Sequence, residues 1–214
     1  MFEVSTFTRG TLYIDMPEVV TSDAYRRINP VGETPTLMTS NGALVSESLA
    51  IFNHLGTAGI GKGLWFAQGT PEFDRQNQVL AFLNTSLFNA YGPFWYAFEH
   101  TLPSEDKAAL RRYGTKKLAK AHRDLEEMLG GDNEWLLGDH RTLADAYFIG
   151  IARWNEYHDA VDRRDYPRVQ RLFDKLEADP GVKFAHAIEH RDEARTTGAF
   201  KGEIALKDAL DLSK

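Results

Sequence analysis

The sequence predicts an α+β protein of two domains, a small N-terminal α/β domain followed by a larger all-helical domain. Short strand-like runs occur before residue 60, whereas apolar residues recur at helical spacing from Pro71 onward. Between the two regions lies the glycine-rich stretch "GTAGIGKG", which has no strand pattern and is typical of a linker. A chain of 214 residues, 43% of them hydrophobic, is long enough to form two small domains with a buried core.

The N-terminal region contains four strand-like runs, which are Phe2–Phe7, Leu12–Asp15, Thr36–Met38 and Ala43–Val45. The dipeptide Asn41-Gly42 lies between the last two runs and predicts a hairpin. Only three residues separate Phe7 from Thr11, whereas parallel strands need a connection of about a dozen residues. If the first two runs are both strands, they therefore form an antiparallel hairpin.

The C-terminal region predicts helices over Phe73–Phe98, Ser104–Leu129, Leu143–Tyr157 and, with interruptions, Pro167–His190. Gly92-Pro93 is expected to break or kink the first of these helices. We assign residues 1–60 to the first domain, 61–70 to a linker, 71–190 to the helical domain and 191–214 to a C-terminal tail. The tail is expected to pack weakly or not at all.

Charge and composition exclude several classes of function. The net charge is −6 and the 25 Lys and Arg residues are scattered, so we expect no nucleic-acid partner. No apolar run reaches the roughly 18 residues of a membrane span, and the N-terminus lacks a secretory signal, so we expect a cytoplasmic protein with no membrane partner. The absence of cysteine excludes disulfides, zinc–thiolate sites and a protein thiol as nucleophile.

One short motif has the spacing of metal ligands. In "HAIEH", His186 and His190 match the spacing of inverted zinc peptidases, which places two imidazoles on one face of a helix. A third ligand would have to come from the short segment that follows. We therefore favour an ordinary helix here and expect no metal.

The stretch Ser46–Ser48, at a predicted helix start, is a candidate site for a small anion. The first N–H groups of a helix are unpaired and carry partial positive charge, so Glu47 and Ser48 are placed to bind a carboxylate. A glutamate in such a site suits a ligand that also carries an ammonium group, and an α-amino acid has both groups. The alternative is that Ser46 caps the helix and Glu47 complements the helix dipole.

Several motifs together resemble the glutathione transferase family, in particular its bacterial cytosolic type. They are "INPVGETPTL" with the Asn-Gly turn that follows, "SESLAIFNHL", "LLGDHRTLADAYFIGIARW" and "YPRVQRLFDKLEADPGVKFAHA". The resemblance implies a thioredoxin-like N-terminal domain, shortened so that its first strand–helix unit is missing or altered, and an all-α C-terminal bundle. Alternatively, Phe2–Phe7 corresponds to the family's second strand. In the third motif, Thr142 and Asp145 look like the family's capping box.

The resemblance also implies a ligand and a reaction. Thr34 would pair with the cysteinyl backbone of glutathione before a cis Pro35, and Glu47 and Ser48 would hold its γ-glutamyl head group. Glutathione would be the co-substrate, and its thiol would be conjugated to a small hydrophobic electrophile without a metal. The implied assembly is a homodimer.

The family's thiolate-stabilising corner is not recognisable in this sequence. In the family a Tyr, Ser or Cys side chain hydrogen-bonds the glutathione sulfur, and the nearest hydroxyls here belong to residues between Ser5 and Thr11. Thr8 is our candidate catalytic residue, with turn and strand-end residues as the alternative interpretation. A second hypothesis is therefore a catalytically impaired relative that serves as a ligand-binding or dimeric interaction protein.

The aromatic run "LFNAYGPFWYAFEH" is a candidate pocket for the electrophile. The break at Gly92-Pro93 would expose rings, and in the family this stretch lines the electrophile pocket. Tyr91 and Trp95 are the candidates because their polar tips tolerate a wet cleft. The alternative is that these rings belong to the hydrophobic core.

Overall fold

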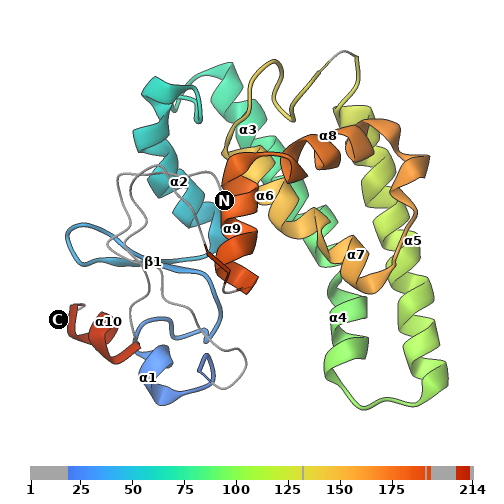
Figure 1. Cartoon of the computed structure of the whole chain (residues 1–214), viewed down its shortest axis with the longest axis horizontal. Coiled ribbons are helices and arrows are strands. Elements are labelled where there is room, and N and C mark those ends of the chain that lie inside the picture. Colours follow the sequence, from blue (N-terminus) through green and yellow to red (C-terminus); the bar gives the residue numbers. More distant parts are fainter. Residues whose placement is uncertain (1–18, 132, 191, 194–205, 213–214) are drawn as a thin grey trace.

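The computed structural model describes residues 19–131, 133–190, 192–193 and 206–212 of the chain. In Figure 1 an N-terminal part with a short two-stranded sheet lies at the left and a helical part lies at the right. This arrangement confirms the predicted fold class of an α/β domain followed by a helical domain. The expected strands Phe2–Phe7 and Leu12–Asp15 lie outside the described residues.

The sheet of the N-terminal domain is the predicted hairpin. Strands β1 (Thr36–Met38) and β2 (Leu44–Ser46) pair antiparallel, with Thr36 opposite Ser46. Gly42 in the turn has a φ angle of 84°, a conformation that glycine adopts without a steric penalty. The second strand begins one residue later than the sequence pattern indicated, which shifts no residue to the other face.

The segment before β1 is held in place by side chains from the short helix α1 (Asp23–Arg26) and the loop after it. The hydroxyl of Tyr25, which is buried, donates a hydrogen bond to the carbonyl of Glu33 at 2.8 Å. The side-chain amide of Asn29, also buried, donates to the same carbonyl at 2.6 Å. These two bonds fix the backbone immediately before Thr34.

Most of the glycine-rich stretch is helical. Helix α2 (Ser48–Gly59) runs through its first half, and the 3-10 turn η1 (Ile60–Lys62) follows directly. A Cβ atom on Gly56 would lie 2.2 Å from the ring of Trp65, whose side chain is only 4% exposed. The linker expectation is therefore wrong for residues 56–59, because a glycine here lets an aromatic ring pack on the helix and does not end it.

The helical domain is built from α3 (Pro71–Phe82), the π-helical segment η2 (Leu83–Phe88), α4 (Gly92–Glu99), α5 (Ser104–Met128), α6 (Leu143–Ala152), α7 (Trp154–His158), the 3-10 turn η3 (Arg163–Asp165), α8 (Pro167–Glu177) and α9 (Pro180–His190). The expected single helix Phe73–Phe98 is thus divided, and the chain breaks at Tyr91, directly before Gly92-Pro93 as predicted. The expected helix Leu143–Tyr157 is interrupted at Arg153, between α6 and α7.

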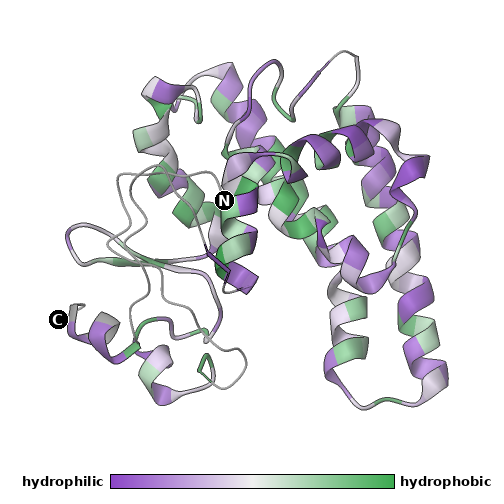
Figure 2. Ribbon diagram, viewed as in Figure 1, coloured by the Kyte–Doolittle hydropathy of each residue, from purple (hydrophilic) through white to green (hydrophobic). Residues whose placement is uncertain are grey.

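Helix α6 lies in the centre of the helical domain, and Figure 2 shows it as mostly hydrophobic. The predicted capping box is present at its start. The carboxylate of Asp145 accepts a hydrogen bond from the N–H of Thr142 at 2.8 Å, and Thr142 Oγ1 accepts one from the N–H of Ala144 at 3.2 Å. Asp145 also accepts a hydrogen bond from the N–H of Leu136 at 3.0 Å, which ties the preceding loop to α6.

The C-terminal helix α10 (Leu206–Leu212) lies beside α1, as Figure 1 shows. These residues therefore contact the N-terminal domain, but most of those whose exposure is described are exposed, and weak packing of the tail stays a prediction. Within the described part of the chain, no helix is both long enough and apolar enough to cross a membrane.

Candidate functional site

The start of α2 has the geometry of an anion-binding helix end. Glu47 is the residue that precedes the helix, and its carbonyl accepts the first helical hydrogen bond, from the N–H of Ile51 at 3.0 Å. No side chain caps the helix, so the N–H groups of Ser48 and Leu49 precede the first bond of the helical ladder. The interpretation in which Ser46 caps the helix is wrong, because Ser46 is the last residue of β2.

Glu47 has an unusual backbone conformation. Its φ angle is 69°, a region that residues with a side chain enter only at an energetic penalty. Such residues are concentrated at binding and catalytic sites, where the surrounding structure over-determines them. The carboxylate of Glu47 is exposed and Ser48 is half-buried.

The four predicted glutathione-binding residues flank the same end of the hairpin. Thr36 pairs with Ser46 at the end of the ladder, so Thr34–Pro35 leads into the hairpin at the same end where Glu47 and Ser48 leave it. The Thr34–Pro35 peptide bond is cis, as the resemblance implied. The segment before β1 and the start of α2 therefore meet at one end of the hairpin.

The helical domain also reaches this end of α2. Tyr147 on α6 lies with its ring 5.3 Å from the ring of Phe52 on α2, and its hydroxyl donates to Oδ1 of Asn84 in η2 at 2.9 Å. Burial raises the pKa of Tyr147 to about 12, and the charge of Glu47 contributes to the rise. The sequence motifs gave no signal for Asn84 or for this use of Tyr147.

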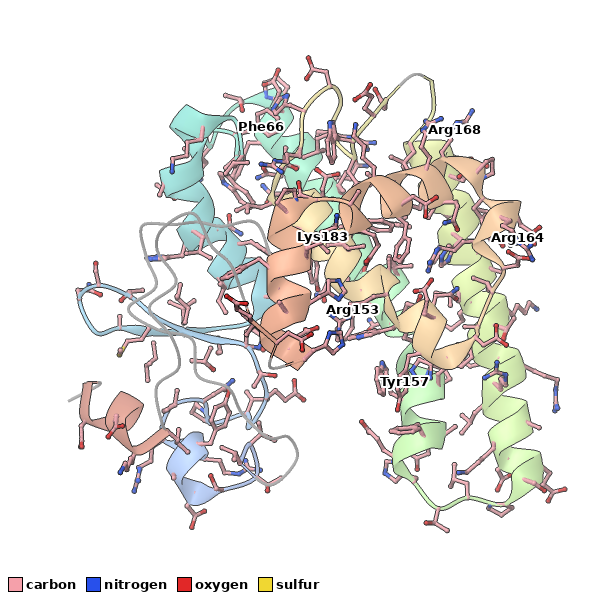
Figure 3. All side chains as sticks on the ribbon, viewed as in Figure 1. Phe66, Arg153, Tyr157, Arg164, Arg168 and Lys183 are labelled. Carbon is pink, nitrogen blue, oxygen red and sulfur yellow. The ribbon has the colours of Figure 1, made fainter. Side chains whose placement is uncertain are left out.

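An aromatic cluster lies where α4 meets α7, and Figure 3 shows Tyr157 at this junction. Trp95 stacks on Tyr157 with 5.4 Å between ring centroids, and the ring of His158 lies 4.4 Å from that of Trp95. The ring of Phe98 lies 5.4 Å from that of Tyr157, and these two side chains are 60% and 58% exposed. They form an apolar surface that the sequence pattern only partly indicated, since Tyr157 comes from another helix.

The reason for choosing Tyr91 and Trp95 as pocket residues does not hold. Tyr91 is completely buried, and neither its hydroxyl nor the indole N–H of Trp95 has a hydrogen-bond partner among the described residues. Burial raises the pKa of Tyr91 above its usual range. The polar tips of both side chains therefore point into the protein, and their assignment to the electrophile pocket stays a prediction.

Two further predictions concern catalysis and metals. Thr8, the candidate catalytic residue, lies outside the described residues. Among the residues that the structure covers, no three His, Cys, Asp or Glu side chains are grouped as metal ligands. His186 lies with its Nε2 atom 3.5 Å from Glu177 Oε1, and its ring lies 6.2 Å from that of His190.

Comparison with known proteins finds a family model that matches each half of the chain. The family model of the glutathione S-transferase N-terminal domain matches residues 11–59, and that of the C-terminal domain matches residues 79–180. Glutathione S-transferase GST-4.5 of Xanthomonas campestris is 30% identical over 172 residues, which cover 78% of this chain and 81% of that protein. The chain belongs to the glutathione S-transferase family.

Other glutathione S-transferases match over similar spans. Glutathione S-transferase GstA of Escherichia coli O157:H7 is 26% identical over 148 residues, which cover 69% of this chain and 70% of that protein. The crystal structure of a glutathione transferase from Methylococcus capsulatus superimposes with a TM-score of 0.70 and 28% identity, over 78% of each chain. The predicted family and its two-domain fold are confirmed.

Proposed function

We propose that this protein binds glutathione at the start of α2 and conjugates the glutathione thiol to a small hydrophobic electrophile. The observation that carries the proposal is the hairpin, which has Thr34–Pro35 and the uncapped helix start at Glu47-Ser48 at the same end. The transferases that match the chain across both domains support the same activity.

Each residue of the proposed glutathione site has a distinct role. The α-carboxylate of the γ-glutamyl group accepts hydrogen bonds from the N–H and hydroxyl of Ser48, where the helix dipole favours negative charge. The ammonium group of the same head pairs with the carboxylate of Glu47. The backbone of Thr34, before Pro35, pairs with the cysteinyl residue as an added strand would.

The chemistry is nucleophilic attack by the glutathione sulfur. The thiol loses its proton, the thiolate forms a carbon–sulfur bond to the electrophile, and a leaving group such as halide departs with the electron pair of its bond. Thr8 is proposed as the hydroxyl that donates a hydrogen bond to the thiolate. Because the chain has no cysteine, the protein itself forms no mixed disulfide during this reaction.

The electrophile is proposed to bind against the aromatic cluster of α4 and α7. Trp95 is the central ring of this cluster, with Tyr91 buried beside Phe94 and the exposed rings of Phe98 and Tyr157 around it. Exposed aromatic surface of this kind favours flat apolar ligands such as aryl halides.

We propose in addition that the protein is a homodimer formed across the first helices of the helical domain. Large aromatic side chains, Tyr96 on α4 and Tyr113 on α5, are exposed on these helices. Light scattering at micromolar concentration tests the assembly, and the mass of a single chain would refute it.

Titration calorimetry with glutathione tests the site. Ser48→Ala removes a hydrogen bond to a charged group, so glutathione binding should weaken by about 1.5–3 kcal/mol. Ser104→Ala is the matched control, because Ser104 is the first residue of α5 as Ser48 is of α2. Equal binding of glutathione by wild type and Ser48→Ala, or no binding by either, would refute the assignment of Ser48 to the glutathione site.

An assay of conjugation separates the enzyme from the alternative function. The catalytically impaired binding protein is not favoured, because the relatives named above are transferases. A glutathione-dependent reaction of an aryl halide, followed by absorbance of the thioether product, is expected for wild type. Binding of glutathione without any conjugation would establish the alternative.

A further inference from the structure

The exposed loop before β1 is anchored by two buried side chains at a single atom. Glu33, Thr34 and Pro35 are all exposed, and they belong to no helix or strand. Tyr25 and Asn29, which are 2% and 3% exposed, both donate hydrogen bonds to the Glu33 carbonyl, at 2.8 Å and 2.6 Å. The carbonyl of an exposed loop can bond to water, so two buried donors are not needed to satisfy it. What the two donors add is a fixed position for this oxygen.

Each of the two anchoring side chains is itself held in place. The Tyr25 hydroxyl carries a single hydrogen, which it donates to Glu33, so Thr36 Oγ1, at 3.2 Å, donates to the Tyr25 oxygen. Asn29 Oδ1 accepts a hydrogen bond from the N–H of Val31 at 3.1 Å, which sets the orientation of the side-chain amide and directs Nδ2 toward Glu33. The two donors therefore have little freedom to leave the carbonyl.

The anchored carbonyl shares a peptide unit with the N–H of Thr34. A peptide unit is planar, and in its trans form the C=O and N–H bonds point in opposite directions. Donors at a carbonyl oxygen prefer the plane of the unit, along its two lone pairs, so a pair of donors restrains both the direction of the C=O bond and the tilt of the plane. The Thr34 N–H is therefore held pointing away from the side chains of Tyr25 and Asn29.

We propose that Tyr25 and Asn29 are positioning residues, which aim the Thr34 N–H at the cysteinyl carbonyl of glutathione. The proposal rests on the proposed function, because it concerns how the backbone of Thr34 is held for the ligand that pairs with it. A hydrogen bond weakens steeply when its angle falls below about 120°, so a peptide unit that is free to tilt makes a poorer contact. Because this bond is the same in the bound substrate and in the transition state, its loss raises KM and leaves kcat unchanged.

The test compares glutathione with an analogue that lacks the cysteinyl carbonyl. In the analogue a trans carbon–carbon double bond replaces the peptide bond between cysteine and glycine, which keeps the shape and adds no charge. The glycine N–H is removed with the carbonyl. Wild type should bind the analogue about tenfold more weakly than glutathione in calorimetry. Equal affinity of wild type for the two ligands would overturn the inference without any variant.

Two variants test the anchors. Tyr25→Phe keeps the buried ring and removes one donor, and Asn29→Ala removes the other. Each should raise the Kd and the KM for glutathione about three- to fivefold, with kcat and the Kd for the analogue within about twofold of wild type. The double variant frees the Glu33 carbonyl, so its Kd for glutathione should approach its Kd for the analogue. Tyr166→Phe, at a buried position beside His122 in the helical domain, is the matched control and should bind both ligands as wild type does.

The outcomes separate this inference from the proposed function. A wild-type protein that binds neither ligand refutes the proposed function itself. A wild-type protein that binds glutathione, with Tyr25→Phe and Asn29→Ala binding it equally well, overturns the inference alone. Equal losses for glutathione and its analogue would also overturn it, because they would show a structural effect with no relation to the cysteinyl carbonyl. Since the two variants remove different donors, either of them decides the matter if circular dichroism shows that the other does not fold.

Discussion

Replacing Gly56 by alanine is the sharpest test of how α2 is fixed to the helical domain. The new Cβ atom would lie 2.2 Å from Trp65 Cδ2 and 2.5 Å from Trp65 Cγ, whereas carbon atoms in contact are about 3.5–4.0 Å apart. The overlap exceeds 1 Å and involves a rigid ring that is almost fully buried. The ring must therefore leave its position or the end of α2 must move away from it.

The magnitude follows from the two opposing effects. Displacing a buried Trp side chain is comparable to truncating it, a loss of about 3–5 kcal/mol. Alanine in place of glycine within a helix returns about 1 kcal/mol. We expect the free energy of unfolding of Gly56→Ala to fall by about 2–4 kcal/mol. Its glutathione affinity should also fall, because α2 carries Glu47 and Ser48 at its other end.

The assay is urea unfolding followed by far-ultraviolet circular dichroism, with Gly150→Ala as the control. Gly150 lies in α6, and a Cβ atom there would have no neighbour within 4 Å. The same substitution should therefore stabilise the protein at Gly150 by about 0.5–1 kcal/mol. If both variants shift the urea midpoint in the same direction by similar amounts, the packing of Trp65 on Gly56 is not what fixes this helix.

Three further predictions follow from the site and the core. Glu47→Gly should raise the free energy of unfolding by about 1 kcal/mol, because glycine adopts the φ angle of 69° without a penalty. The same variant should bind glutathione more weakly in calorimetry. Unchanged stability would contradict the backbone strain at Glu47. Burial lowers the pKa of His122 to about 4, so the native ring stays neutral while the unfolded ring takes up a proton below about pH 6.5. Between pH 6.5 and pH 4 the free energy of unfolding should therefore fall by about 3 kcal/mol more in wild type than in His122→Asn. Urea titrations at each pH would measure this difference. Parallel pH profiles of the two proteins would contradict a neutral native ring. Thr142→Ala should lower thermal stability by the equivalent of about 1–2 kcal/mol, since it removes the buried acceptor for the N–H of Ala144; calorimetric melting that matches wild type would show that the cap contributes nothing.

Local chemistry explains why some elements could be predicted from the sequence. The hairpin turn at Asn41-Gly42 and the break before Gly92-Pro93 depend on backbone preferences of the residues themselves. The capping box of Thr142 depends on a partner three residues away. The residues of the proposed glutathione site could be named because their motifs combine a turn, a strand and a helix start within a short stretch.

Long-range packing explains what the sequence did not reveal. The helix that runs through the glycine-rich stretch is stabilised by Trp65, which lies beyond the end of α2. The hydrogen bond between Tyr147 and Asn84 joins residues 63 positions apart. Tyr91 and Trp95 were expected at a wet surface because of their polar tips, but Tyr91 is completely buried and Trp95 packs edge-on against Trp154.

The π-helical segment Leu83–Phe88 has a consequence for how this protein can vary. A π-helical turn holds one residue more than an α-helical turn, and one residue corresponds to a rotation of about 100° around the helix axis. The side chains of α3 and those that follow Phe88 are therefore out of phase with each other. Removal of a single residue within the segment would restore a regular helix and turn everything after it by that angle. Asn84 would then lose its hydrogen bond with Tyr147, or Phe88 its contact with Trp154, so a one-residue deletion here would change how α6 and Trp154 pack on this segment.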